Sequence, residues 1–247
     1  MKQIIVILVA SWLVTGCGKA NVYTNDSFSP AIFINASPGV SGALPQAGLH
    51  VFIDTFQKSA STIAYRGGSG YISSSPGLRS VQVRSSLNLK TNFIDLAAET
   101  FTSNQATTYF IYDTLSGANQ KLRTLRLIDN LTLPDAGFVN FRFLNAAVNA
   151  APIDITFLRT SVTPNDSVTV TNQPYIGQTP VAATFSPFSR KLPLGSYTIK
   201  LKTAGTQNVL VTPTIINLSP FSSIYTFFAT GTAVGLPLSL GAIRHYP

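Results

Sequence analysis

The chain has 247 residues, of which 45% are hydrophobic and 11% charged, and its formal net charge is +8. This hydrophobic content can fill a sizeable core, and a disordered chain would be less apolar and more highly charged. The single cysteine excludes an internal disulfide and a cysteine-cluster metal site, and two histidines leave little material for a metal centre or a general base. We therefore expect no metal and no cofactor. Plentiful Thr, Ser, Val, Phe, Gly and Pro favour strands over helical bundles.

The N-terminal segment has the features of an export signal. Lys2 precedes an apolar run over residues 4–14, which is too short to span a bilayer but fits a secretory signal. The run ends in Leu-Val-Thr-Gly-Cys17, which resembles the lipobox of bacterial lipoproteins. The resemblance implies removal of residues 1–16 and attachment of lipid to Cys17, which would tie the protein to a membrane. An ordinary signal peptide with a chance cysteine is the alternative.

Residues 17–30 are polar and lack apolar periodicity, so we expect a tether that lifts a folded body off the membrane. We expect a cell-envelope location, with the outer membrane as the specific prediction. No acidic run follows Cys17, which leaves a periplasmic and a surface-facing body both open. The basic residues of the mature chain are dispersed, and an exported protein does not normally meet nucleic acid, so no nucleic-acid partner is expected.

From residue 31 onward the same sequence pattern occurs in two consecutive copies. The first copy opens with Ile-Phe-Ile-Asn35-Ala and the second with Arg-Phe-Leu-Asn145-Ala, each a short apolar strand ending in Asn-Ala. Four further strands are expected in each copy. These are an alternating strand (49–54 and 153–157), a glycine-led strand (77–84 and 195–202), an aromatic strand in which Tyr109 matches Tyr225 (108–112 and 224–228), and a closing strand (121–128 and 236–244).

The turn-forming residues of 131–137 mark the boundary between the copies. Two domains follow, at 31–130 and 138–247, each with many short strands separated by Gly and Pro. The domain size and the number of short strands predict an all-β protein of two tandem antiparallel β-sandwiches of immunoglobulin-like type. A β-barrel is the alternative architecture.

These repeated strands resemble the DUF4397 domain, over 31–130 and again over 138–246. The shared features are the Asn-Ala strand end, the alternating second strand, the glycine-led strand and the tyrosine in the late strand. The resemblance implies a Bacteroidota-type exported protein with tandem domains behind a lipobox. This family has no assigned activity, so the resemblance supplies no catalytic residues.

Few residues carry obvious chemistry. The glycine cluster at 67–70 lacks the Lys and Ser/Thr of a phosphate loop and the second Gly of a nucleophile elbow. His50 and His245 have no spacing to a Ser and a carboxylate that indicates a catalytic triad. The acidic residues are dispersed and form no calcium loop. We therefore predict a protein that is not an enzyme.

The remaining candidates for ligand contact are Tyr65, Tyr71 and Tyr175, which lie in loop-like regions. A tyrosine can stack its apolar face on a sugar ring, although tyrosines at the edge of a core are the plainer interpretation. The sequence thus predicts a non-catalytic binding or scaffolding role toward envelope proteins or glycans. The alternatives are a glycan-binding accessory lipoprotein in nutrient capture, an envelope hydrolase that uses His50 or His245, and a structural spacer.

Overall fold

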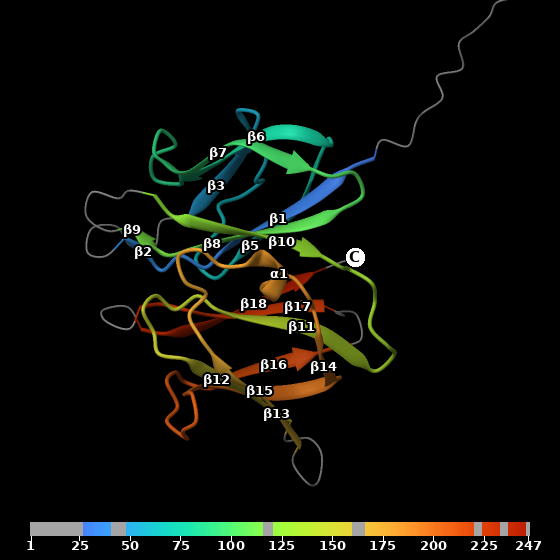
Figure 1. Cartoon of the computed structure of the whole chain (residues 1–247), viewed down its shortest axis with the longest axis vertical. Helices are drawn as coiled ribbons and strands as arrows, with labels where there is room; N and C mark the ends of the chain where they lie inside the picture. The colour runs from blue at the N-terminus through green and yellow to red at the C-terminus, as the bar shows by residue number, and fades with distance from the viewer. Residues whose placement is uncertain are drawn as a thin grey trace, which may run out of the picture.

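The computed structural model describes residues 27–40, 48–115, 121–159, 166–219, 224–232 and 237–245. The predicted signal, Cys17 and most of the tether lie outside the described residues. Strands make up most of the described chain, and the short helix α1 (Ala182–Phe185) joins two of them. Among the described residues no helix is long and apolar enough to cross a membrane. Figure 1 shows two stacked units of similar architecture.

The first unit consists of two facing four-stranded sheets. The inner sheet has the order β10 (Arg123–Asp129), β8 (Ala106–Tyr112), β1 (Ser29–Asn35), β5 (Gly68–Ser74). The outer sheet has the order β4 (Phe56–Gln57), β3 (Leu49–Ile53), β6 (Gly77–Ser85), β7 (Asn92–Phe101). A short pair, β2 (Gly39–Val40) with β9 (Thr114–Leu115), extends one end of the unit.

The second unit repeats this plan. Its inner sheet has the order β14 (Arg190–Pro193), β11 (Phe138–Asn145), β17 (Ile224–Thr230), β18 (Ser239–His245). Its outer sheet has the order β13 (Asp166–Gln173), β12 (Ile153–Arg159), β15 (Gly195–Thr203), β16 (Thr214–Leu218). The predicted all-β sandwich class, with two repeated units, is confirmed. One parallel pair lies in each inner sheet, β1 with β8 and β11 with β17, whereas the prediction named antiparallel sheets only.

Strand register corrects one detail of the repeat. Asn35 lies opposite Ile111 in the first unit, and Asn145 lies opposite Ala229 in the second. Tyr109 therefore corresponds to Phe227, not to Tyr225 as the sequence match supposed. Both strands carry aromatic residues at alternating positions, so a shift of two residues leaves their pattern almost unchanged.

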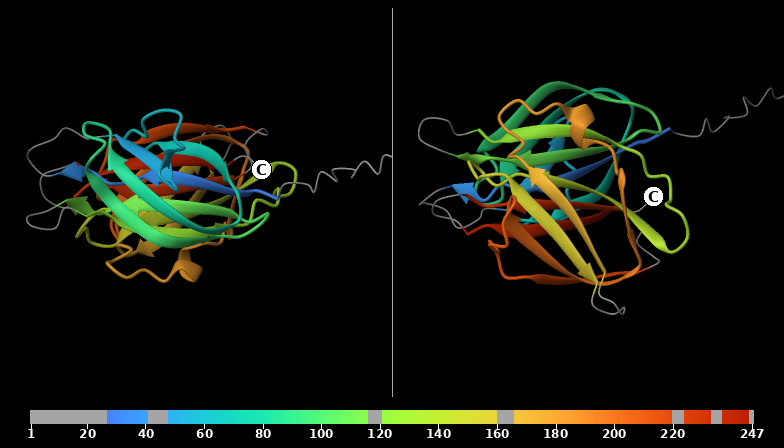
Figure 2. Two further views of the ribbon diagram at one scale, coloured as in Figure 1. Left: turned by 90° about the horizontal axis from the view of Figure 1, so that it is seen from above. Right: turned by 60° about the horizontal axis from the view of Figure 1, so that its bottom comes forward.

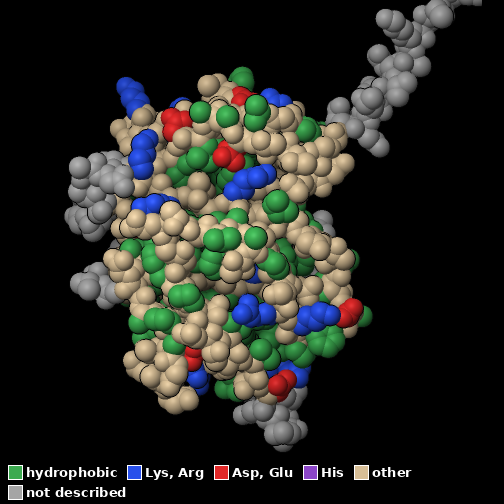
Figure 3. All heavy atoms as spheres, viewed as in Figure 1, with side chains coloured by type: hydrophobic (Ala, Val, Ile, Leu, Met, Phe, Trp, Pro, Cys, Tyr) green, Lys and Arg blue, Asp and Glu red, His purple; other side chains and the backbone are tan. Residues whose placement is uncertain are grey.

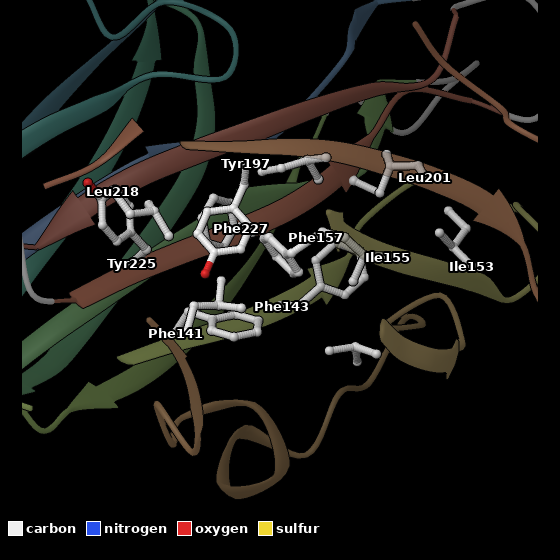
Figure 4. Packing of buried hydrophobic residues seen from close by; sticks show 14 of the residues in the cluster. Phe141, Phe143, Ile153, Ile155, Phe157, Tyr197, Leu201, Leu218, Tyr225 and Phe227 are labelled. Carbon is white, nitrogen blue, oxygen red and sulfur yellow. The ribbon is translucent and has the colours of Figure 1, made fainter. Parts of the chain in front are cut away.

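The central strands of the two inner sheets are buried on both faces. Every residue of β8 and of β17 is buried, because one face packs inside its own unit and the other packs against the facing unit. Figure 2 shows the layers from two further directions. The core of the second unit is rich in aromatics, with the rings of Phe157 and Phe227 5.1 Å apart (Figure 4). A further apolar cluster fills the interface between the units.

Equivalent residues of the two units meet in this inter-unit cluster. Phe110 and Phe228 occupy the same position in β8 and β17, and their rings make an edge-to-face contact at 5.1 Å. Ala36 and Ala146, which follow the matched asparagines, also both belong to the cluster. An approximate two-fold relation between the units produces such like-to-like contacts, whereas a simple translation would bring unlike faces together.

Candidate functional site

A cluster of buried polar side chains lies in the interface between the units. Its centre is Arg142 on β11, which is 2% exposed. Arg142 Nη1 donates to Asp129 Oδ1 at 2.8 Å, and Nη2 donates to Thr108 Oγ1 at 2.8 Å. Asp129 ends β10 and Thr108 lies on β8, so a guanidinium of the second unit is held by two strands of the first. The Arg142 guanidinium also lies over the ring of Phe188 at 4.3 Å.

His245 closes this polar cluster on its other side. It is the last residue of β18 and is completely buried. Its Nε2 lies 2.8 Å from Thr226 Oγ1, and its Nδ1 lies 2.7 Å from the Tyr71 hydroxyl. Tyr71 donates in turn to Asp129 Oδ2 at 3.0 Å, and Arg142 Nε donates to Thr226 Oγ1 at 2.8 Å.

These contacts form a closed ring of hydrogen bonds when the imidazole is neutral and carries its proton on Nδ1. The Thr226 hydroxyl then donates to Nε2, and Nδ1–H donates to the Tyr71 oxygen, which frees the Tyr71 proton for Asp129. We infer this tautomer from the network, because the positions of the ring protons follow from their partners. Every nitrogen of the Arg142 guanidinium and both nitrogens of the His245 ring then have a hydrogen-bond partner, as a buried network requires.

Burial sets the ionisation of the cluster. Desolvation lowers the pKa of His245 to about 4, with Asp129 raising it and Arg142 lowering it to smaller extents. Desolvation also raises the pKa of Tyr71, and the neighbouring Asp129 carboxylate raises it further. The imidazole and the phenol are thus both neutral at pH 7, and the one ion pair is Arg142 with Asp129.

This arrangement joins the two units and buries the imidazole completely. The envelope-hydrolase alternative requires a histidine with a serine and a carboxylate in a pocket. His245 does lie near a carboxylate, with Nδ1 3.9 Å from Asp129 Oδ2, but its hydroxyl partners are a threonine and a tyrosine and no part of it reaches solvent. His50 lies 3.2 Å from Ser59 Oγ, and its other side-chain partners are Gln57 and Thr62 rather than a carboxylate.

The three tyrosines singled out from the sequence all lie at the inter-unit interface. The Tyr65 hydroxyl lies 3.1 Å from Ser239 Oγ of the second unit. Tyr175 packs against the inter-unit cluster, and burial raises its pKa. Tyr71 belongs to the polar ring. Tyr65 and Tyr175 are equivalent, because the next residue of each donates its backbone N–H to Asn35 or Asn145. Their contact with a ligand stays a prediction.

The residue at the centre of the ring, Arg142, was not singled out from the sequence. One signal was present: the first copy has Ile32 at the equivalent position, in a strand that is otherwise apolar. A charge in such a strand indicates a paired buried group. The partners Asp129 and His245 carried no such signal, because each lies at a strand end beside turn-forming or terminal residues.

A cleft opens to the surface beside the buried ring. Its volume is about 570 Å³, and its lining joins the connection between the units to the segment around α1. Exposed Ile128 and Leu133 supply apolar surface, and Asn140 contributes a buried Oδ1 that has no hydrogen-bond partner among the described residues. Within the described ranges, no three side chains of the His, Cys, Asp and Glu types come close enough together to hold a metal ion.

A second polar surface covers the outer sheet of the first unit. The Arg84 guanidinium lies 4.1 Å above the ring of Phe52, and Arg84 donates to Asn92 Oδ1 at 3.1 Å and to Gln82 Oε1 at 2.5 Å. Gln82 lies opposite Asp95 on β7, and His50 lies opposite Arg84 on β3. We call the group formed by Phe52, Gln82, Arg84, Asn92, Asp95 and His50 the outer-face cluster. The second unit has Thr156, Lys200 and Lys202 where the first has Phe52, Gln82 and Arg84.

A family model described as a domain of unknown function, DUF4397, matches residues 32–156. The chain belongs to this family. The matched segment covers just over half of the chain, and it runs from β1 across the connection at 131–137 into β12. The predicted family is thereby confirmed, while its tandem occurrence over two separate spans stays a prediction.

No curated protein matches the chain. Among solved structures, the chain is similar to a carbohydrate-binding module of family CBM26 from Eubacterium rectale Amy13K, solved in complex with maltoheptaose. The two share 10% sequence identity with a TM-score of 0.26, over 88% of this chain and 98% of that chain. At this score, the likeness carries no argument about the ligand of the present protein.

Proposed function

We propose that this protein is a lipid-anchored, non-catalytic cell-envelope protein whose two units form one rigid body for binding or scaffolding. The observation that carries the proposal is the closed ring around Arg142. It uses the side chains best suited to catalysis to join the units: His245 and Asp129, which are buried, and Tyr71, which is partly buried. An active site instead needs such groups within reach of a substrate.

The anchor is supported by the lipobox-like sequence that ends at Cys17. Labelling of cells with a radioactive fatty acid tests it directly. The full chain is expected to take up label and to fractionate with membranes, whereas a Cys17→Ser variant takes up none. Mass spectrometry of the mature N-terminus gives the second measurement. An N-terminus that still carries residues 1–16 without lipid would contradict the anchor.

A second candidate function, glycan binding, is supported by the outer-face cluster. Protein sites for neutral sugars combine planar hydrogen-bonding side chains with an apolar surface, because a sugar ring has hydroxyls around its edge and C–H groups on its faces. Gln82, Arg84 and Asn92 supply donors and acceptors in adjacent strands, and they are already held by one another. Such mutual contacts reduce the entropy that these side chains lose on binding.

A glycan array with the purified mature chain tests this candidate. Binding to a neutral oligosaccharide that is lost in Arg84→Ala and Gln82→Ala is the expected result. Lys200→Ala, at the position of the second unit that is equivalent to Gln82, is the matched control and should bind as the wild type does. If the wild type bound no glycan, or if all variants bound equally, glycan binding by the outer-face cluster would be contradicted. Protein partners would then be the better supported hypothesis for the binding role.

A further inference from the structure

The chain enters the folded body at one particular end. β1 begins there at Ser29, β10 ends there at Asp129, and β18 ends there at His245, which contacts the Asp129 region. Figure 1 shows β10 ending on the same side as the start of β1. We call this the tether end, and define it by the starts of β1 and β11 and by residues 128–138.

Large apolar side chains are exposed at the tether end. Phe28 is 50% exposed, Phe138 40% and Leu133 60%, and Ile128 is exposed beside them. Phe28 and Phe138 occupy equivalent positions, each seven residues before the matched asparagine of its unit. The two-fold relation therefore places one exposed phenylalanine of each unit at the same end. Figure 3 shows apolar side chains distributed over one face of the molecule.

An exposed ion pair lies at this end. Lys191 donates to Asp135 at 2.6 Å, and both side chains are exposed. The cleft beside the polar ring, which Ile128 and Leu133 line, also opens here. A surface with exposed phenylalanine and leucine beside a paired lysine fits the boundary between lipid headgroups and acyl chains, because apolar side chains partition there without requiring anionic lipid.

The length of the tether brings this end to a membrane. Ten residue steps separate Cys17 from Ser27, the first described residue, and such a segment reaches at most about 35 Å. An acylated Cys17 would thus hold the tether end within a short distance of the bilayer at high effective concentration, so that even a weak apolar contact would be occupied. The opposite end would then face away from the membrane, and the outer sheets would form the sides of the body.

We propose that the tether end is a membrane-docking surface, in which Phe28, Phe138 and Leu133 seat on the lipid to which Cys17 is anchored. The inference rests on the proposed anchor and adds to it a fixed orientation of the body. The second unit would dock as well as the first, because its Phe138 lies at the same end as Phe28. A tether alone would leave the body free to tumble above the bilayer.

Single engineered cysteines test the docking, because Cys17 is the one native cysteine and its sulfur would be acylated. Leu133→Cys and Phe138→Cys report on the tether end. Leu87→Cys is the control, because Leu87 is also 60% exposed but lies at the end of the molecule opposite to the tether end. β6 begins near the tether end at Gly77, which pairs with Phe101, and Leu87 lies in the turn after the other end of this strand. Each acylated protein is labelled with an environment-sensitive dye and reconstituted into phosphatidylcholine vesicles.

We expect a blue-shifted, several-fold stronger emission at positions 133 and 138, quenched by lipid-attached quenchers and insensitive to salt, with no change at position 87. A Phe28→Ser change should weaken the signal at position 138. Solvent-like emission at all three positions, together with an acyl group on Cys17 by mass spectrometry, would overturn the docking while leaving the anchor standing. Absence of the acyl group would overturn both, and equal shifts at all three positions would indicate self-association instead of docking.

Discussion

His245 occupies the position in the second unit that Asp129 occupies in the first, and the two side chains meet across the inter-unit interface. Ala106 lies opposite Asp129, and Ile224 lies opposite His245, in the two equivalent strand pairs. Their closest side-chain atoms, Nδ1 and Oδ2, are 3.9 Å apart, and the Tyr71 hydroxyl bonds to both residues. The repeat thus places unlike groups at like positions, and the interface depends on the difference.

Replacing Arg142 is expected to destabilise the whole chain. An Arg142→Met variant leaves the Asp129 carboxylate buried without its cation, which costs about 3–5 kcal/mol in comparable cases. Because the ring joins the units, we expect the wild type to unfold in urea as one cooperative transition and the variant to unfold earlier. Circular dichroism measured against urea concentration gives the midpoint and the slope.

The control for this variant is Lys191→Met, which removes the cation of the exposed Asp135 pair. Exposed pairs contribute little, so its midpoint should match that of the wild type. Equal midpoints for all three proteins would show that the ring does not hold the units together.

The free energy of unfolding should decrease as the pH falls, because His245 is buried in its neutral form. Its pKa is about 4 in the folded chain and ordinarily 6.5, so between these values the unfolded chain binds more protons than the folded one. The contribution is complete above pH 6.5 and is lost progressively as the pH falls toward 4, up to about 3 kcal/mol. Protonation also puts a second donor on Nε2 against Thr226, whose oxygen already accepts from Arg142.

Thermal unfolding between pH 7.5 and pH 5 measures this dependence. A His245→Gln variant should be less stable than the wild type at pH 7.5 but should lose less of its stability on acidification. A His245→Gln variant that loses as much stability as the wild type would assign the acid dependence to other groups.

Gly241 is required for the packing of Phe228 in the inter-unit cluster. A Cβ atom at position 241 would lie 2.1 Å from Phe228 Cζ, so the ring would have to move out of its contact with Phe110. We expect Gly241→Ala to cost about 1–3 kcal/mol, as overpacking of a core does. Differential scanning calorimetry compares it with Gly68→Ala, where the new Cβ would meet Ile243 at an ordinary 3.5 Å. A Gly241→Ala melting temperature equal to that of Gly68→Ala would contradict this account.

The matched asparagines fix the ends of β1 and β11. Asn35 Oδ1 accepts the backbone N–H of Ser37, and Asn145 Oδ1 accepts that of Ala147, while each Nδ2 donates to a carbonyl of the neighbouring segment. We expect Asn35→Ala and Asn145→Ala each to cost about 1–3 kcal/mol, because buried backbone groups lose their partners. Asn130→Ala, which removes a similar turn at an exposed position, should cost less than about 0.5 kcal/mol in urea titrations.

Much of the fold could be predicted from the sequence because the alternating strands carry their own signal. Leu49, Val51 and Ile53 pack inward as their spacing indicates. The inner strands are different, since β8 and β17 are buried on both faces and show no alternation of polar residues. The inter-unit interface could not be predicted for the same reason. A run of apolar residues indicates a buried strand, but it does not indicate which element covers each face.

The candidate site was less predictable for the same reason. The tyrosines were identified as residues with a special role, but whether a hydroxyl meets a sugar or a strand of the other unit depends on the relative placement of the units. Arg142 and Asp129 lie 13 residues apart on strands of different units, and no local spacing encodes their contact. His245 joins them from the far end of the chain.

The approximate two-fold relation has a consequence for how such a body can be built. In a symmetric dimer of two identical chains, every residue beside the two-fold axis has an identical residue across from it. Two aspartates or two histidines would then face each other in a buried interface. Carrying both halves on a single polypeptide removes that constraint. Each half is then free to differ where they touch, so that a carboxylate can lie beside a neutral imidazole at a point where a symmetric assembly would place two carboxylates together.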